Sequence, residues 1–254
     1  MMVHRRLAEL KLAFMLFTRF PVGRLKDVIP DVGASGWAWP LTGFAVAVPA
    51  SLVYLLLYTA GLGAQVSALG LVATLALCSG AMHEDGLADM ADGFGGGRSK
   101  DQKLDIMRDS RIGSYGVLAL IFAVAIHASL IARLQDPSLV IPAAIGLSMA
   151  SRGCLPFWLR WMPPARQDGL GQTVSIVSKG TALAAIAIGF AGLLAVGLLP
   201  AIVGFCAVMA CGAAVSGLAM KQIGGQTGDV MGSIQKLSEI AGWTVITLLM
   251  ASTS

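Results

Sequence analysis

The chain has 254 residues, of which 56% are hydrophobic and only 13% are charged, and its mean hydropathy is +0.76. Soluble domains carry about 25% charged residues, so this composition excludes an ordinary soluble domain and predicts a polytopic membrane protein. The formal net charge is +4. In a membrane protein the positions of Lys and Arg report orientation in the bilayer, so this excess does not indicate nucleic-acid binding and we expect no such partner.

Residues 4–20 predict an amphipathic helix that lies in the membrane interface, with its basic and acidic residues off the apolar face. Packing of the same helix on the bundle is an alternative that does not exclude the first. The segment is not a cleavable signal, because Glu9 and Lys11 interrupt its apolar part. The apolar positions at helical spacing are Val3, Leu7, Leu10, Phe14 and Phe17.

Seven apolar stretches follow, and a spanning helix needs about 20 apolar residues. The apolar run Thr181–Met220 is too long for one membrane crossing, and the turn expected to divide it into two spans is Gly197 to Pro200. The fold expected is all-α, a polytopic bundle of about seven transmembrane helices plus the interfacial helix, in one membrane-embedded domain over residues 1–254. The expected spans are Trp39–Ala60, Ala64–Met82, Val117–Ala132, Leu139–Leu159, Thr181–Leu199, Ala201–Met220 and the short Ile240–Ala251.

Basic residues gather on one side of this topology. With the N-terminus cytoplasmic, all but Arg133 of the 18 Lys and Arg residues fall on the cytoplasmic side, as the positive-inside rule requires. The polar motifs then face the cytoplasm too. The residues on that side are Arg5, Arg6, Lys11, Arg19, Arg24, Lys26, Arg98, Lys100, Lys103, Arg108, Arg111, Arg160, Arg166, Lys179, Lys221 and Lys236, with Arg152 in the inner half of its span.

Half of the acidic residues, seven of 14, lie in the segment 83–116. On a helix Asp85, Asp89 and Asp92 are spaced by four and then three residues, so their side chains share one face. Carboxylates stacked in this way repel one another without a counter-ion, and Mg²⁺ is a hard cation that takes oxygen ligands. The spacing therefore predicts a magnesium site, with Glu84 as a weaker candidate ligand because it points away from the stripe.

The stretch 93–97 has four glycines in five positions, which disfavours a stable helix. Glycine permits positive φ and close approach of the backbone to a ligand. We therefore expect a loop in which Gly95 and Gly96, together with Arg98, cradle a phosphate of the substrate.

A second polar stretch carries Asp105 and Asp109 four residues apart, beside Arg108 and Arg111. Carboxylates that hold a cation and guanidiniums that clamp phosphoryl oxygens form such a pattern, although a solvated helix with ordinary ion pairs is the alternative. The pattern partly resembles the CDP-alcohol phosphotransferases, in which a DxxDG motif, here residues 89–93, precedes two aspartates four apart. The Ala-Arg pair usual after the glycine is not in its place.

As a whole, the chain resembles cobalamin synthase, the adenosylcobinamide-GDP ribazoletransferase family, almost from end to end. One departure is Glu84, where an apolar residue is common in the family. The motifs that carry the resemblance are TRFP at 18–21, WPLTG at 39–43, HEDGLAD at 83–89, DG at 92–93, IMRDSRIG at 106–113, YG at 115–116, SRG at 151–153, GLG at 169–171 and GGQTGD at 224–229, followed by Gly232.

The resemblance implies the last assembly step of coenzyme B12 synthesis, in the bacterial inner membrane. The alcohol of α-ribazole, or of its 5′-phosphate, attacks the phosphorus linked to cobinamide in adenosylcobinamide-GDP, and GMP leaves. Magnesium is required. Asp109 is then a candidate for a further metal ligand or for the base that accepts the hydroxyl proton. Arg108 and Arg111 would stabilise the pyrophosphate and GMP.

Further site residues are expected outside the aspartate stripe. His83 is a candidate base or a capping and packing residue. Arg152 lies in an apolar span, where a charge must face a cavity or pair with a carboxylate. Arg19 is a substrate contact or an interfacial anchor. The polar residues of the GGQTGD motif form a second ligand-binding wall or a plain helix cap and turn; they are Gln226, Thr227 and Asp229.

Two other functions are open. A transporter would also carry intramembrane carboxylates, but here they cluster at one end, no acidic residue is expected in the middle of another span, and no internal repeat is found. A CDP-alcohol phosphotransferase would release CMP rather than GMP. Many glycines suit tight helix packing, so a homo-oligomer is possible.

Overall fold

The computed structural model describes residues 2–25, 29–166 and 177–251. Within these ranges the chain is helical and contains no strand beyond an isolated bridge between Pro164 and Gln226. The helices are α1 (Met2–Phe17), η1 (Gly33–Ala38), α2 (Trp39–Thr59), α3 (Gly63–Ser79), α4 (Met82–Gly96), α5 (Lys100–Ile106), α6 (Ser114–Leu134), α7 (Pro137–Gly153), α8 (Leu155–Trp161), α10 (Lys179–Leu193), η2 (Leu194–Val196), α11 (Leu198–Ile223) and α12 (Gly228–Ala251).

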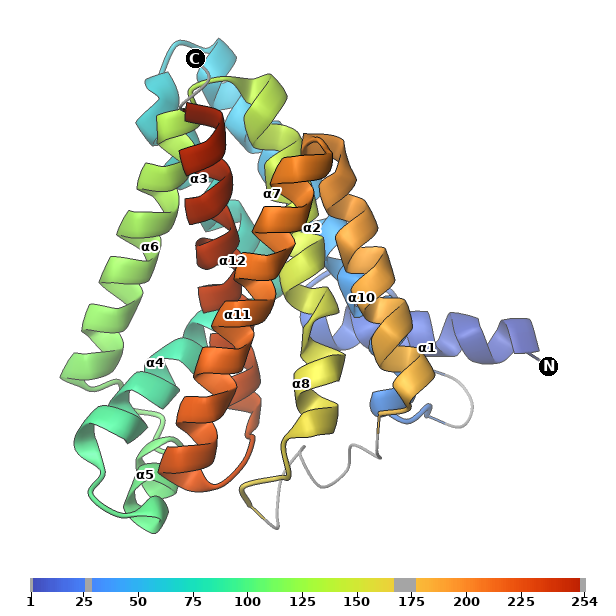
Figure 1. Cartoon of the computed structure of the whole chain (residues 1–254), viewed down its shortest axis with the longest axis vertical. Helices are drawn as coiled ribbons and strands as arrows, with labels where there is room; N and C mark the ends of the chain where they lie inside the picture. Colours follow the sequence, from blue (N-terminus) through green and yellow to red (C-terminus); the bar gives the residue numbers. More distant parts are fainter. Residues whose placement is uncertain (1, 26–28, 167–176, 252–254) are drawn as a thin grey trace.

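The apolar helices lie side by side and form a bundle of membrane-spanning length (Figure 1). Five helical stretches in the described part are long and apolar enough to span a membrane, and a sixth is obtained when α3 and α4 are counted together. The all-α polytopic fold is therefore confirmed. The stretches that pass alone are Gly33–Thr59, Ser114–Leu134, Pro137–Trp161, Lys179–Val196 and Leu198–Ile223.

The last expected span is only the C-terminal half of a longer helix. Helix α12 starts at Gly228, so Lys236 lies inside it and not in a loop, and Glu239 lies in its middle. Both side chains are buried, at 1% and 3% exposure. Lys236 Nζ lies 2.8 Å from Glu84 Oε1 of α4, and Gln235 Nε2 donates to Glu239 Oε2 at 3.1 Å. Such partners offset the cost of burying these charges.

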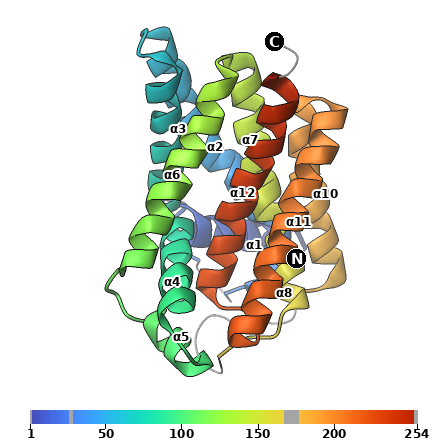
Figure 2. The ribbon, with the colours of Figure 1, turned by 60° about the vertical axis from the view of Figure 1, so that its left-hand side comes forward.

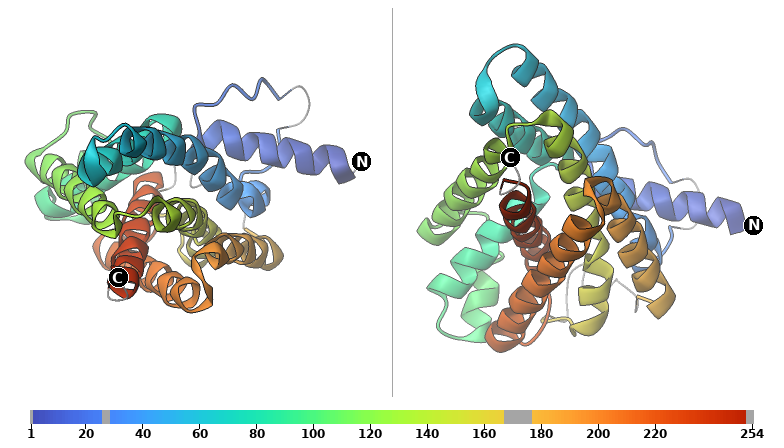
Figure 3. Two further views of the ribbon diagram at one scale, coloured as in Figure 1. Left: turned by 90° about the horizontal axis from the view of Figure 1, so that it is seen from above. Right: turned by 45° about the horizontal axis from the view of Figure 1, so that its top comes forward.

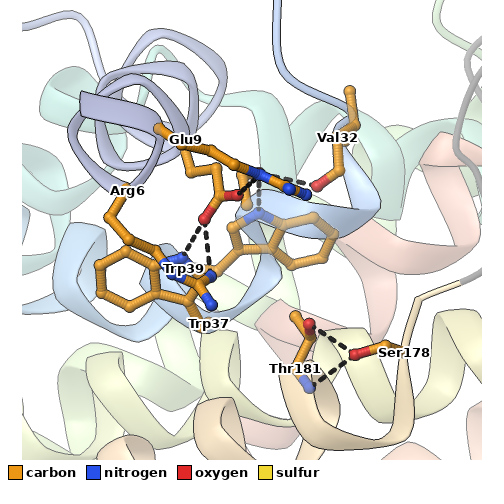
Figure 4. A network of polar contacts seen from close by, with 9 residues as sticks. Arg6, Glu9, Val32, Trp37, Trp39, Ser178 and Thr181 are labelled. Atoms are coloured by element: carbon orange, nitrogen blue, oxygen red, sulfur yellow. Dashed lines mark hydrogen bonds and ion pairs between the residues drawn. The ribbon is translucent and has the colours of Figure 1, made fainter. Parts of the chain in front are cut away.

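Helix α1 lies across the bundle, and its N-terminus projects beyond it (Figures 1 and 3). Its attachment depends on Glu9, which is 1% exposed and accepts hydrogen bonds from Trp37 Nε1 and Arg6 Nη1, both at 2.8 Å (Figure 4). Glu9 is therefore covered by η1 rather than exposed to solvent. Leu7, at 57% exposure, remains available for the membrane interface that the sequence predicts.

Within the described residues, polar segments that carry sequence motifs meet at one end of the bundle (Figures 1 and 2). Helix α5, the C-terminal end of α11 and the first turn of α12 lie at this end, and the short connections around residues 60–62, 135–136 and 197 lie at the opposite end. The site described below is built at the motif-bearing end.

Candidate active site

A sharp bend between α3 and α4 turns the acidic helix away from the spanning direction by 91°. Gly80 ends α3 with a φ of +70°, and Ala81 continues in the left-handed region at +55°. Two successive left-handed residues reverse the local backbone direction, and only glycine adopts that conformation without cost. Helix α4, with its four carboxylates, therefore does not continue the direction of α3.

Close backbone packing joins α4 to the first turns of α12. A Cβ added to Gly86 would lie 2.9 Å from the carbonyl oxygen of Asp229, and one added to Gly232 would lie 3.3 Å from the carbonyl oxygen of Met82. Ser233 Oγ donates a hydrogen bond of 3.0 Å to the Gly86 carbonyl. The two glycines let the helices approach closely enough for side chains on both to share one site.

This approach brings Asp229 of α12 to the aspartate stripe of α4. Burial, followed by the negative charges of Asp85, Asp229 and Asp92, raises the pKa of Asp89 to about 6. Burial also raises the pKa of Asp229, and Asp85 contributes to that rise. Mutually repelling carboxylates without an equal positive charge indicate that the site is made for a cation.

Arg166 supplies the positive charge that faces this cluster and was not singled out from the sequence as a site residue. It lowers the pKa of both Asp89 and Asp229, and its Nη2 donates a hydrogen bond of 2.8 Å to the Leu104 carbonyl. Its segment is held by the GGQTGD loop, since the backbone nitrogen of Ala165 donates to the carbonyl of Gln226 at 2.9 Å. In the sequence, Arg166 is one arginine in a polar connection. It could be assigned to the site only once the backbone pairing between Ala165 and Gln226 was known.

The GGQTGD loop forms the helix cap and turn that was one of its two predicted roles, and its role as a ligand-binding wall stays a prediction. Gly224 caps α11 with a φ of +73°, and Thr227 Oγ1 accepts a hydrogen bond of 3.3 Å from the Val230 amide in the first turn of α12. Gln226 is 4% exposed and is engaged through its backbone with residues 163–165. The caps fix the loop so that Asp229 projects to the acidic cluster. The GLG motif at 169–171 lies outside the described residues.

Asp92 has a partner that the metal hypothesis did not foresee. Its Oδ2 accepts a hydrogen bond of 2.7 Å from the Gly113 amide and its Oδ1 one of 2.9 Å from the Gly116 amide, at the start of α6. A carboxylate is favourable there because the first amides of a helix lack partners and carry partial positive charge. In this structure Asp92 caps α6, and Asp229 takes the place expected for it in the cluster.

Glu84 is likewise engaged elsewhere. Its Oε1 lies 2.8 Å from Lys236 Nζ, and both side chains are largely buried. Burial alone would raise the pKa of Glu84, but the Lys236 ammonium lowers it well below its ordinary value. Lys236 Nζ also lies 3.4 Å from His127 Nδ1. The ion pair fastens α4 to α12, so Glu84 acts here as a packing partner rather than as a metal ligand.

The glycine stretch after Asp92 does not form the expected loop. Helix α4 continues to Gly96, and no glycine between 93 and 97 has a positive φ. A Cβ on Gly95 would lie 2.7 Å from the ring of Tyr115, and one on Gly97 would lie 2.7 Å from the backbone nitrogen of Lys103. The expected loop was therefore wrong, because these glycines serve close packing against α5 and α6, while phosphate binding by Gly95 and Gly96 stays a prediction.

The basic residues of the acidic segment lie on its exposed side. Arg98 is exposed beyond α4, and its amide donates to Gln102 Oε1 at 3.0 Å. Arg108 is also exposed. Arg111 Nη2 donates to Asp109 Oδ2 at 2.8 Å, and this hydrogen bonding lowers the pKa of Asp109. A carboxylate with a lowered pKa is a weak base, so this conformation does not favour Asp109 as the proton acceptor.

The remaining three predicted residues lie around the bend and in the interior. Arg19 is exposed and lies over the bend, because its Nε would be 2.0 Å from a Cβ on Gly80. Arg152 is 2% exposed and donates to the hydroxyl of Ser148 at 2.7 Å, inside the bundle. His83 is 2% exposed, and its Nε2 has no hydrogen-bond partner among the described residues.

The residues fit a divalent cation in donor chemistry and charge. Asp85, Asp89 and Asp229 offer the carboxylate oxygens that Mg²⁺ prefers, and burial, followed by the neighbouring negative charges, raises the pKa of Asp89. They do not form a closed coordination shell: within the described residues no three His, Cys, Asp or Glu side chains stand close enough to hold a metal ion. Mg²⁺ often keeps several waters or substrate phosphates as ligands, so an open arrangement suits it.

A model of the cobalamin-5-phosphate synthase family matches residues 9–247. The chain belongs to this family. The adenosylcobinamide-GDP ribazoletransferase of Mesorhizobium japonicum is 40% identical over 247 residues, which cover 97% of this chain and 95% of the relative. The protein of the same name from Bradyrhizobium diazoefficiens is 41% identical over 236 residues, covering 92% and 91%. That from Azorhizobium caulinodans is 39% identical over 250 residues, covering 93% and 94%.

No solved structure matches the chain. The part matched by the cobalamin-5-phosphate synthase family includes α4, the GGQTGD loop and the buried ion pair between α4 and α12. Family membership confirms the resemblance found in the sequence motifs.

Proposed function

We propose that this member of the cobalamin-5-phosphate synthase family joins adenosylcobinamide-GDP to α-ribazole or its 5′-phosphate in a Mg²⁺-dependent reaction. The ribazole hydroxyl oxygen forms a bond to the phosphorus linked to cobinamide, the bond from that phosphorus to the oxygen of GMP breaks, and the hydroxyl proton is released. The products are adenosylcobalamin, or its 5′-phosphate, and GMP. The names of the relatives support the substrates.

The observation that carries the proposal is the convergence of Asp85, Asp89 and Asp229, with Arg166 facing them, at one end of an apolar bundle. Carboxylates of this cluster would serve as part of the ligands of a hydrated Mg²⁺, which would supply charge neutralisation on the pyrophosphate. Arg166 is placed to attract phosphoryl oxygens to the same site. Transfer of a phosphoryl group needs positioning and charge neutralisation more than covalent chemistry, and these residues provide both.

We further propose that the protein lies in the bacterial inner membrane with this end of the bundle in the cytoplasm. The support is the distribution of basic residues: Lys100, Arg111, Arg160 and Lys221 belong to segments at the site end, and Arg133 belongs to the other. Lys and Arg accumulate in cytoplasmic connections. Both substrates are then reached from the cytoplasm.

The test uses the purified protein in liposomes with adenosylcobinamide-GDP, α-ribazole and Mg²⁺. Formation of cobalamin is followed by its visible spectrum, and nucleotide release by chromatography. We expect the wild type to form GMP and cobalamin, and Asp85→Ala and Asp229→Ala to form neither. The control is Asp101→Ala, which removes an exposed carboxylate of α5 and should turn over like wild type. Turnover that survives both site variants would refute the assigned metal ligands, and absence of turnover in folded wild type would refute the reaction.

A further inference from the structure

A cavity of about 270 Å³ opens beside the acidic cluster. It lies between α1, α2, α4, α8 and α12, so it forms only where five separate segments meet. Its size is close to the lower end of sites that enclose small molecules, about 300–1,000 Å³. Its walls include Phe17, Trp39, Leu155 and Leu159, and its polar residues are His83, Asp85, Gln226 and Asp229.

One wall of the cavity consists of rings. The ring centroids of Phe17 and Trp39 are 4.9 Å apart at 51°, and Phe17 stacks on His83 with centroids 6.0 Å apart and an interplanar angle of 16°. Leu155 and Leu159 also line the cavity, which therefore presents apolar and aromatic surface. A flat aromatic group gains from burial against such surface and from ring contacts.

His83 provides a hydrogen-bonding group at this wall. Its side chain lines the cavity at 2% exposure, and its Nε2 has no partner among the described residues. A buried polar atom without a hydrogen-bond partner destabilises the folded protein. Such an atom at the wall of a cavity therefore indicates a ligand that completes the hydrogen bond.

The same cavity reaches the reacting end of the site. Asp85 and Asp229 both line it, so a ligand whose apolar part fills the cavity places its polar part beside the proposed Mg²⁺ site. The corrin ring of cobinamide is too large for about 270 Å³. The other substrate has the matching shape, because α-ribazole joins a flat benzimidazole base to a ribose that carries the attacking hydroxyl.

We infer that this cavity is the α-ribazole subsite. The base lies against Phe17 and Trp39, its free ring nitrogen bonds to His83 Nε2, and the ribose points toward Asp85 and Asp229. This inference rests on the proposed function and adds the place and orientation of the nucleophile. It also makes His83 a substrate-binding residue rather than a base.

Gly228 offers a direct test, because it lines the cavity and a Cβ added there meets no protein atom within 4 Å. In Gly228→Leu the added side chain starts in open space at the wall of the cavity, where it should compete with a ligand. We expect the KM for α-ribazole to rise about tenfold or more, with the KM for adenosylcobinamide-GDP unchanged. The matched control is Gly217→Leu in α11, where a Cβ also meets nothing within 4 Å and which lies outside the cavity. It should behave as wild type.

Equilibrium dialysis of α-ribazole against the protein without the corrinoid gives an independent readout. Wild type should bind, and Phe17→Leu, which removes the ring but keeps an apolar side chain, should bind several-fold more weakly. Equal effects of Gly228→Leu on both substrates, or none on α-ribazole, would overturn the subsite while leaving the reaction intact. If the wild type makes no cobalamin, the proposed function is overturned. Binding of α-ribazole in dialysis, and its weakening in Phe17→Leu, then tests the subsite separately.

Discussion

Replacing Asp92 separates a structural aspartate from the functional ones. Its two carboxylate oxygens accept the amides of Gly113 and Gly116. In Asp92→Ala water can reach the exposed amide of Gly113, so that loss costs about 0.5–1 kcal/mol, whereas the buried amide of Gly116 is left unpaired at about 1–3 kcal/mol. We therefore expect the free energy of unfolding to fall by about 2–4 kcal/mol in total, which includes the lost helix cap.

The assay is thermal unfolding in detergent, measured with and without Mg²⁺. Asp92→Ala should unfold several degrees lower but keep the stabilisation that Mg²⁺ gives, and Asp92→Asn, which retains one acceptor oxygen, should fall between. Asp85→Ala is the matched control: its side chain is exposed, so stability should persist while the response to Mg²⁺ disappears. If Asp92→Ala unfolds like wild type and loses the Mg²⁺ response, Asp92 is a metal ligand and the reasoning fails.

Three further outcomes follow from the geometry. Because the pKa of Asp89 is about 6, protons should compete with Mg²⁺ for this carboxylate. The rise in Tm that Mg²⁺ causes should therefore be complete above pH 6 and decline as the pH falls through 6. The same rise in Tm at pH 5 and at pH 7.5 would contradict this prediction. Gly86→Ala places a Cβ against the α12 backbone, so it should lower the free energy of unfolding by about 1–3 kcal/mol and reduce turnover. Gly217→Ala, where the Cβ lies in open space, should change neither stability nor turnover. Equal behaviour of the two variants would count against tight packing at Gly86. Lys236→Met should lower the free energy of unfolding by about 3–5 kcal/mol, because it leaves the Glu84 carboxylate buried without its partner. Adding Glu84→Gln should restore part of that stability in a double-mutant cycle on unfolding. Additive losses in the two variants would argue against the ion pair.

Without Mg²⁺ the same Asp89 shift has a defined sign for stability. The folded-state pKa lies above the ordinary value of 3.8, so the folded protein binds more protons than the unfolded chain between about pH 4 and 6. This group therefore contributes stability below about pH 4 that is lost as the pH rises through 6. We expect bound Mg²⁺ above pH 6 to take the place of the lost proton and to offset that loss.

The sequence predicted the parts of the site that depend on spacing within one helix. Asp85 and Asp89 do share a face of α4, and both belong to the acidic site. The third member of the stripe, Asp92, could not be assigned from spacing, because the start of α6 competes for its oxygens. Four glycines in five positions disfavour a helix locally, yet packing of α4 against α5 and α6 overrides that preference.

The sequence by itself determined the membrane class, the helical fold, the approximate spans and the acidic segment, because composition and periodicity follow from burial in lipid and from helix geometry. Only the tertiary structure decided that Asp229 and Arg166 complete the cluster, that Glu84 pairs with Lys236, and that a cavity lies beside the site. These features join segments up to about 150 residues apart, as the bond between Ser233 and Gly86 shows at a separation of 147. Which faces of two helices meet is set by close packing at particular glycines, and no local pattern reports it.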